Sequence, residues 1–226
     1  MSKIIKTGNI DNYMDMFHPE CVVLDCDGTL YPEIGTAREI FNDLLSEYLK
    51  NKFKYSRRQV LRFLSDNKLR FSTVSEIAAC LLWGIDENEL NKNVIEKMPL
   101  ERIGIKRAFE WHRILKHDVP IIIFTNNSSF FARLIAKRLG IFEGVSKIFG
   151  EKELSCKRKP EIETFGRIVS FLEDKNNILY FDDDDSCLGV GKKLGWHAVK
   201  PIFGNSIVDM SACVDGFLIE NYGLSK

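Results

Sequence analysis

The sequence has no excess of charge of either sign. Its 32 lysines and arginines are balanced by 32 aspartates and glutamates, so the formal net charge of the 226 residues is zero. A neutral chain gives no electrostatic reason to expect a nucleic-acid or membrane partner, although a local basic patch would not show in this sum. We therefore expect neither a nucleic acid nor a membrane as a partner.

Long apolar segments and metal-binding cysteine pairs are also missing. The longest apolar runs are too short to cross a bilayer, and residues 1–10 contain no apolar stretch of signal-peptide length. The six cysteines form no C-x-x-C pair, and none lies near histidines at zinc-finger spacing. These absences predict a cytoplasmic protein whose cysteines are reduced thiols.

What the sequence does contain is a set of short apolar runs between helical patterns. Residues 21–24, 121–124 and 178–181 end abruptly in polar residues, which is typical of buried strands. Residues 147–149 and 197–199 are weaker candidates. Strands that are apolar throughout and alternate with helices predict an α/β fold with a doubly wound parallel sheet, covered on both faces.

Residues 35–105 interrupt this alternation because their pattern is helical throughout. One apolar stripe recurs there at helical spacing, formed by Ile40, Phe41, Leu44, Leu45, Tyr48 and Leu49. The chain must return afterwards to finish the sheet, so a small inserted module is simpler than a separate domain. We predict a core of residues 1–30 and 106–226, with an all-helical insert of residues 31–105.

Polar residues and a glycine mark helix ends within this insert. Ser56 is placed to cap one helix and Asp86 another, because their side chains can accept hydrogen bonds from free N–H groups. Thr73 and Glu76 have the spacing of a capping box, and Gly84 is predicted to end the helix that follows. Three aromatic residues are expected to form the core of the insert: Phe63, Phe71 and Trp83.

Polar and acidic residues follow each predicted strong strand. The first is followed by Asp25-Cys26-Asp27-Gly28-Thr29, the second by Thr125-Asn126-Asn127, and the third by four aspartates, residues 182–185. A basic run, residues 157–159, stands before Pro160 and a helical segment. Ligands of open α/β sheets bind beyond the carboxyl ends of the strands, so we expect these groups to meet at one edge.

Converging carboxylates repel one another unless a cation lies among them. Oxygen ligands in incomplete number suit Mg²⁺ and leave room for substrate oxygens. One carboxylate can attack phosphorus, and a second can protonate the leaving oxygen and later deprotonate a water molecule. A lysine with hydroxyl and amide donors can hold the charge on the phosphoryl oxygens. The cluster therefore predicts magnesium-dependent phosphoryl chemistry.

The order and spacing of these residues resemble four motifs of the haloacid dehalogenase superfamily of phosphohydrolases. The matching positions are Asp25-x-Asp27-Gly28-Thr29, then Thr125, then Lys159-Pro160 with Phe165, then Asp182-Asp183 with Gly195. Together they span roughly residues 21–201. A helical insert between the first two motifs is similar to the cap found in members of this superfamily.

This resemblance implies a role for each matching residue. Asp25 would be the nucleophile and a direct Mg²⁺ ligand, and Asp27 the general acid and base, with its backbone carbonyl on the metal. Asp183 would be a further ligand, with Asp182 on the metal or behind it. The phosphoryl group would be bound by Thr125, the backbone at Asn126, and Lys159. The second carboxylate, Asp27, distinguishes phosphohydrolases from the dehalogenases of the superfamily.

Some assignments stay open at the level of sequence. The spacing to Gly195 favours Asp182 and Asp183, but Asp184 or Asp185 could share the metal or serve as a solvated loop and helix cap. Pro160 selects Lys159 rather than Lys157 as the third-motif lysine. Lys157 and Arg158 are expected to be solvated surface charges.

The expected activity is hydrolysis of a small phosphomonoester. Leu30-Tyr31-Pro32 resembles pyrimidine 5'-nucleotidase-like members of the superfamily, which suggests a nucleoside monophosphate; a sugar phosphate is the alternative. A phosphotransferase or mutase would use the same intermediate, and a catalytically inactive binding protein is the third possibility. The sequence identifies neither the substrate nor the oligomeric state, nor the role of residues 205–226.

Overall fold

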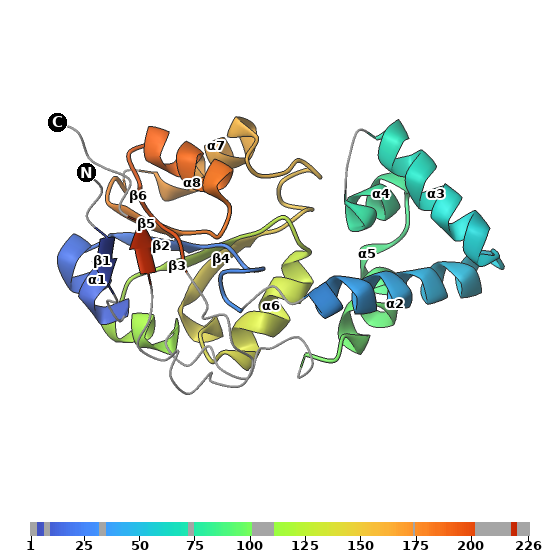
Figure 1. Ribbon diagram of the computed structural model, residues 1–226, viewed down its shortest axis with the longest axis horizontal. Coiled ribbons are helices and arrows are strands. Elements are labelled where there is room, and N and C mark those ends of the chain that lie inside the picture. The colour runs from blue at the N-terminus through green and yellow to red at the C-terminus, as the bar shows by residue number, and fades with distance from the viewer. Residues whose placement is uncertain are drawn as a thin grey trace.

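The computed structural model describes residues 4–6, 10–31, 35–71, 75–100, 111–173, 175–201 and 218–220. The predicted α/β class is confirmed, because five parallel strands form one sheet in the order β4-β3-β2-β5-β6 (Figure 1). The strands are β2 (Cys21–Leu24), β3 (Ile121–Phe124), β4 (Val145–Phe149), β5 (Ile178–Phe181) and β6 (His197–Val199). The three strong predictions have the expected bounds, since every residue of β2, β3 and β5 is buried.

Helices cover both faces of this sheet, as a doubly wound fold requires (Figure 1). Val22 and Leu24 pack in one apolar cluster with α1 (Ile10–Phe17) and α6 (Ser129–Arg138). Cys21 and Val23, whose side chains point the opposite way, pack in a second cluster with α7 (Ile162–Leu172) and α8 (Asp185–Lys193). A 3-10 helix, η3 (Trp111–His117), joins the first cluster ahead of β3, and another, η4 (Phe142–Gly144), precedes β4.

A two-stranded antiparallel ribbon lies apart from the main sheet. It pairs β1 (Ile4–Lys6) with β7 (Leu218–Glu220), so two segments from opposite ends of the chain lie side by side. Residues 218–220 therefore form a strand, but not one of the parallel sheet. The remainder of the stretch 205–226 lies outside the described residues.

The helices of residues 35–100 pack on one another at one end of the molecule, beyond α6 (Figure 1). They are α2 (Gly35–Phe53), α3 (Arg57–Arg70), α4 (Glu76–Trp83), α5 (Glu87–Asn93) and η1 (Ile95–Lys97). The predicted apolar stripe of α2 faces inward, with Leu45 and Leu49 fully buried. Residues 101–105 lie outside the described residues.

The helix ends of this region agree with the sequence except at α4. Ser56 caps α3 in a capping box with Gln59, and Asp86 caps α5. Gly84 ends α4 with a left-handed backbone, at a φ of 101°. The prediction that Thr73 starts α4 was wrong: the helix begins two residues later than that box requires, and Ser75 accepts the hydrogen bond from the N–H of Ala78 at 3.1 Å. Thr73 itself lies outside the described residues.

Aromatic side chains hold the far side of this region together. Phe63 and Trp83 make an edge-to-face contact with ring centroids 5.1 Å apart, and Phe53 and Tyr55 pack against Phe63. Phe63 is buried and Trp83 partly exposed, and Phe71 at the end of α3 is half-buried. Of the three aromatic residues predicted for the core of the insert, Phe63 is therefore buried there, Phe71 is half-buried, and Trp83 packs on Phe63 from an exposed position.

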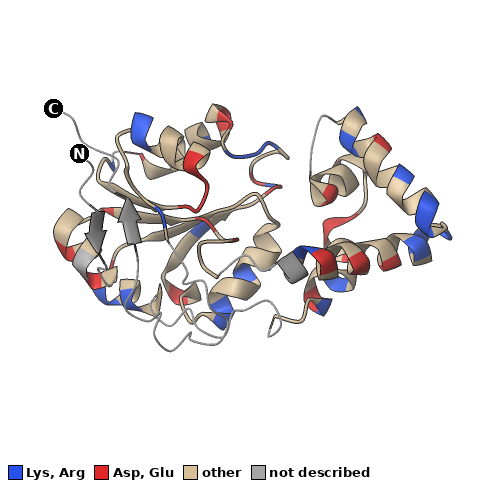
Figure 2. Cartoon of the chain, in the orientation of Figure 1, with Lys and Arg blue, Asp and Glu red and all other residues tan. Residues whose placement is uncertain are grey.

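The neutral sum of charges conceals a local imbalance. Helix α3 carries five basic residues and one acidic residue, and it forms a basic outer edge of the molecule (Figure 2). The helices in the described part of the chain include none that could span a membrane. The five described cysteines, at positions 21, 26, 80, 156 and 187, are free thiols, and Cys213 lies outside the described residues.

Candidate active site

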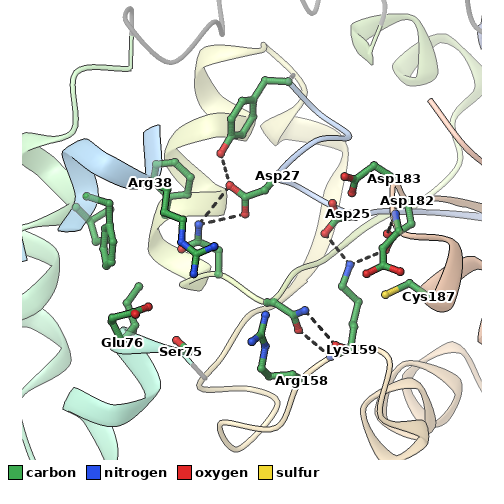
Figure 3. A pocket seen from close by; sticks show the side chains of 18 of the residues that line it. Asp25, Asp27, Arg38, Ser75, Glu76, Arg158, Lys159, Asp182, Asp183 and Cys187 are labelled. Carbon is green, nitrogen blue, oxygen red and sulfur yellow. Dashed lines mark hydrogen bonds and ion pairs between the residues drawn. The ribbon is translucent and has the colours of Figure 1, made fainter. Parts of the chain in front are cut away.

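A cavity of about 340 Å³ lies between the sheet and the helical insert (Figure 3). Its first wall is made by residues that directly follow β2, β3 and β5, which include Asp25, Asn126 and Asp182. The facing wall comes from α2, α4 and the segment around η1. Acidic residues lie on the loops of the first wall (Figure 2). The strand ends predicted to meet at one edge therefore do so, and the insert closes over them.

Asp25 is the first residue after β2 and is almost completely buried, at 5% exposure. Its backbone N–H donates to the carbonyl of Phe181 at 2.9 Å, which fixes it at the end of the sheet. Burial raises the pKa of Asp25 well above its usual range; Lys159 opposes this, while Asp182 and Asp27 add to it. The site therefore disfavours a carboxylate here unless cations accompany it.

Lys159 supplies one of those cations. Its Nζ lies 2.6 Å from Asp25 Oδ1 and 2.6 Å from Asp182 Oδ2, and the residue is 6% exposed. Burial alone would lower the pKa of Lys159, but Asp25 and Asp182 raise it well above its usual range, so the ammonium stays charged. Asn126 holds this loop in place, because its side chain accepts from the N–H of Lys159 at 2.7 Å and donates to its carbonyl at 3.3 Å.

The four consecutive aspartates have different surroundings. Oxygens of Asp25, Asp182 and Asp183 all lie within 4.8 Å of one another. Asp182 also accepts from the hydroxyl of Tyr180 and from the N–H of Asp184. Asp184 instead caps α8, and Asp185 turns outward to Lys200 at 3.0 Å. Of the four aspartates, Asp182 and Asp183 thus have oxygens grouped with those of Asp25, whereas Asp184 and Asp185 have other partners.

The carboxylate cluster fits a divalent cation. Oxygens of three carboxylates gather within a few ångströms of one another, and the ammonium of Lys159 contacts two of them, Asp25 and Asp182. An all-oxygen ligand set of this kind suits Mg²⁺.

Asp27 has different neighbours from Asp25. It accepts a hydrogen bond from the hydroxyl of Tyr31, and Asn127 Nδ2 donates to its two oxygens at 3.1 and 3.4 Å. Both partners are neutral, and all three residues line the cavity (Figure 3). The sequence placed Asn127 at this edge and used Tyr31 only in a family resemblance, and it assigned neither residue a contact with Asp27. Position was the signal for both: Tyr31 follows the first motif, and Asn127 follows β3.

A profile of the haloacid dehalogenase-like hydrolase family matches residues 19–195 of the sequence. This chain belongs to that family. The match includes all four motif positions, and the resemblance drawn from the sequence is thereby confirmed.

Solved structures show the same fold at low sequence identity. A HAD phosphatase from Thermococcus onnurineus is 20% identical with a TM-score of 0.56, over 84% of this chain and 90% of that one. The UTR4 protein of Saccharomyces cerevisiae is 14% identical with a TM-score of 0.54, over 85% and 94%. A putative phosphatase from Clostridium difficile is 17% identical with a TM-score of 0.50, over 88% and 92%. No curated protein sequence matches this one.

Within this hydrolase, Thr125 and Cys26 are buried behind the cavity. Thr125 Oγ1 accepts from the N–H of Asn127 at 3.0 Å, so its hydroxyl shapes the loop after β3. Cys26 is fully buried, and burial, Asp27 and Asp25 raise the pKa of its thiol well above the usual range. The prediction that Cys26 points into the core is therefore confirmed.

The basic run differs from its prediction at one residue. Lys157 is exposed and lies 3.4 Å from Glu163, as expected of a surface charge. Arg158, however, is half-buried and lines the cavity beside Lys159 (Figure 3). The expectation that Arg158 is solvated was wrong, because the loop that presents Lys159 turns its neighbour toward the same space. Arg38 of α2 lines the cavity as well, with no signal in the sequence.

Proposed function

We propose that this hydrolase cleaves small phosphomonoesters with the help of Mg²⁺, through a phosphoryl group carried briefly on Asp25. The supporting observation is the contrast between the two carboxylates of the first motif. Asp25 is buried against Lys159 and two further carboxylates, whereas Asp27 is held by neutral donors and faces the cavity. Such a contrast suits one carboxylate to attack and the other to transfer protons.

In the first half of the reaction, an oxygen of Asp25 attacks the phosphorus of the ester. The bond from phosphorus to the ester oxygen breaks, and the leaving alcohol takes a proton from Asp27. The products are an aspartyl-phosphate and the free alcohol. Lys159, with the backbone N–H at Asn126, would hold the phosphoryl oxygens as charge develops on them. Thr125 would support this role by fixing the loop after β3.

In the second half, a water molecule attacks the same phosphorus. It gives a proton to Asp27, and the bond from phosphorus to Asp25 breaks. Inorganic phosphate leaves, and both carboxylates return to their starting states. Tyr31 and Asn127 would hold Asp27 in place through both transfers.

Mg²⁺ would be held by the carboxylates of Asp25 and Asp183 and by the backbone carbonyl of Asp27. Asp182 would sit on the ion or behind it, because Lys159, Tyr180 and the N–H of Asp184 already occupy its oxygens. When bound, the ion would neutralise negative charge between the nucleophile and the phosphoryl oxygens.

The two parts of the chain would have different functions in the reaction. Residues 1–30 and 106–226 would form the catalytic core, and residues 31–105 would form a cap that excludes water and contacts the leaving group. The described free cysteines support a reducing compartment such as the cytoplasm.

Phosphate release from a panel of phosphomonoesters tests this proposal, with Mg²⁺ and with a chelator, for the wild type and for Asp25→Asn. The substitution keeps the shape of the site and removes the attacking oxygen. We expect metal-dependent turnover that falls by about a thousandfold or more in the variant. Product analysis separates hydrolysis from phosphoryl transfer. Folded protein that binds Mg²⁺ but turns over no ester would contradict the proposal.

A further inference from the structure

Three basic residues line the cavity, and two of them lack an acidic partner. Lys159 is bound to Asp25 and Asp182. Arg38 and Arg158 have no carboxylate within 4.0 Å among the residues that the structure describes. Glu151 lies near enough to Arg158 for their charges to interact, but not at ion-pair distance. Two guanidinium groups are thus turned toward the cavity without a protein partner.

Other charges at the edge of the insert are paired. Lys52 lies 2.5 Å from Glu89, and Lys68 lies 2.8 Å from Glu76, an acidic residue that itself lines the cavity. Glu76 is therefore already neutralised. The two arginines therefore carry the positive charge of the cavity wall that no carboxylate at ion-pair distance neutralises among the described residues.

Arg158 also has an unsatisfied hydrogen-bond donor. Its Nε is buried and has no hydrogen-bond partner among the described residues. A buried donor without a partner is unfavourable, because it has lost hydration without gaining a hydrogen bond. The backbone of the next residue, Lys159, is clamped by Asn126, and the N–H of Arg158 donates to Glu161 at 3.2 Å. The backbone that carries this guanidinium is therefore fixed before any ligand arrives.

The arginines lie on the side of the cavity where a leaving group would extend. Asp27 would protonate the leaving oxygen, so the leaving group must start beside Asp27. In Figure 3, Arg38 and Arg158 lie on the insert side of Asp25, away from Asp182 and Asp183. The wall of the insert, to which Arg38 belongs, also carries apolar side chains that could cover a short carbon chain: Phe41, Ile77, Ile95 and Met98.

We propose that Arg38 and Arg158 form a subsite for a second anionic group on the leaving group of the substrate. The substrate class is then a small phosphomonoester that also bears a carboxylate or a second phosphate. Guanidinium groups bind both anions through paired hydrogen bonds. The cavity volume of about 340 Å³ lies at the lower end of the roughly 300–1,000 Å³ typical of ligand pockets, which favours a compact molecule. This inference rests on the proposed phosphatase function.

Matched pairs of esters test it, with kcat and KM measured for each member. The pair 3-phosphoglycerate and glycerol 3-phosphate tests a carboxylate, and fructose 1,6-bisphosphate and fructose 6-phosphate tests a second phosphate. For the wild type, we expect kcat/KM to be higher by about tenfold or more for the member with the second anionic group, in at least one pair. Equal values in both pairs, or a nucleoside monophosphate as the best substrate, would overturn the subsite.

The variants Arg38→Gln and Arg158→Gln are compared with Arg62→Gln, an exposed arginine of α3 that pairs with Asp66 and is not among the residues lining the cavity. In each cavity variant, the loss of kcat/KM on the preferred ester with a second anionic group should exceed the loss on the ester without it by about tenfold, chiefly through KM. Equal losses on both esters would show that the arginines act on the reacting phosphoryl group, and would refute the subsite.

Binding to Asp25→Asn protein separates failure of this inference from failure of the proposed function. Calorimetric titration with the two esters of a pair measures recognition without turnover. The subsite is supported if the ester with the second anionic group binds more tightly and if this preference is lost in the double variant Asp25→Asn, Arg38→Gln. This holds even if the reaction differs from the one proposed. Equal binding overturns the subsite and leaves hydrolysis to be judged from phosphate release.

Discussion

Gly28 determines how closely Asp183 approaches the first motif. Its φ is +79°, and a Cβ at this position would collide with the Asp183 carboxylate. We expect Gly28→Ala to lower stability by about 1–2 kcal/mol through backbone strain, and to weaken Mg²⁺ binding by about tenfold or more by displacing a ligand. Thermal unfolding and metal titration measure the two effects.

Gly84→Ala is the matched control for this substitution. Gly84 has a φ of +101° but nothing within 4 Å of the added Cβ. It should lose a similar amount of stability while its Mg²⁺ affinity is unchanged. Unaltered metal binding in Gly28→Ala would show that Asp183 is not a ligand.

The hydroxyl of Tyr31 is one of only two side-chain donors to Asp27 among the described residues. Tyr31→Phe removes that donor and keeps the ring, which packs edge-on to Phe131. We expect kcat to fall by about tenfold with a smaller change in KM, because a loosely held carboxyl group transfers protons less effectively. Tyr55→Phe, in the aromatic cluster of the insert, serves as the control. Equal kcat values in both variants would contradict a positioning role.

Residues with a fixed spacing in the chain could be predicted, and residues brought in by the fold could not. Asp25 and Asp27 are two positions apart at the end of an apolar run, so the strand itself presents them. Arg38 reaches the cavity only because α2 packs over the sheet edge, and Arg158 only because its loop turns inward. Neither event has a periodic or compositional signature.

At the scale of elements, the four aspartates change function where helix α8 begins. Asp184 accepts from the hydroxyl of Ser186 and from its N–H, the latter at 2.7 Å, and these hydrogen bonds, chiefly the one from the hydroxyl, lower the pKa of Asp184. We expect Asp184→Ala to cost about 1 kcal/mol of stability through the lost cap. Asp183→Asn should instead weaken Mg²⁺ binding by about tenfold or more while changing stability little. Chemical unfolding and metal titration of both variants check this division, and the reverse pattern would move the ligand to Asp184.

Whole elements were predicted best where burial dictates every residue. Strands β2, β3 and β5 are buried throughout, so their apolar runs have sharp ends. The start of α4 was misplaced because Thr73 and Ser75 are both good capping residues two positions apart. Only the local backbone decides between such candidates. Strand β1 was missed because its partner, β7, lies at the other end of the chain.

At the scale of the molecule, pairs of residues from distant segments take part in the contact between the helices of residues 35–100 and the rest of the chain, beside a shared apolar cluster. Lys152 follows β4 and lies 2.5 Å from Glu87 of α5. Its neighbour Glu151 is 1% exposed and faces the start of α4, where Ser75 and Ala78 lie. Pairs of this kind have no periodic pattern, which is why the sequence predicted a helical insert but not how it sits on the sheet.

Glu151 should make this contact sensitive to pH. Burial raises its pKa from 4.5 to about 7, while Ser75 and Arg158 oppose the shift. An acid whose pKa is raised by folding stabilises the folded state below its unfolded pKa, and this contribution is lost as the pH rises through the folded value. For Glu151 the loss falls between about pH 4.5 and 7 and amounts to about 3 kcal/mol at most.

Glu151→Gln removes this titration while keeping the size of the side chain. We expect the variant to gain about 1–3 kcal/mol over the wild type between pH 5 and pH 8, because only the wild type must ionise a buried group. Urea unfolding at several pH values measures the difference. The control is Glu143→Gln, a substitution at an exposed glutamate of η4. A stability difference that stays constant across this range would contradict a folded-state pKa of Glu151 raised to about 7.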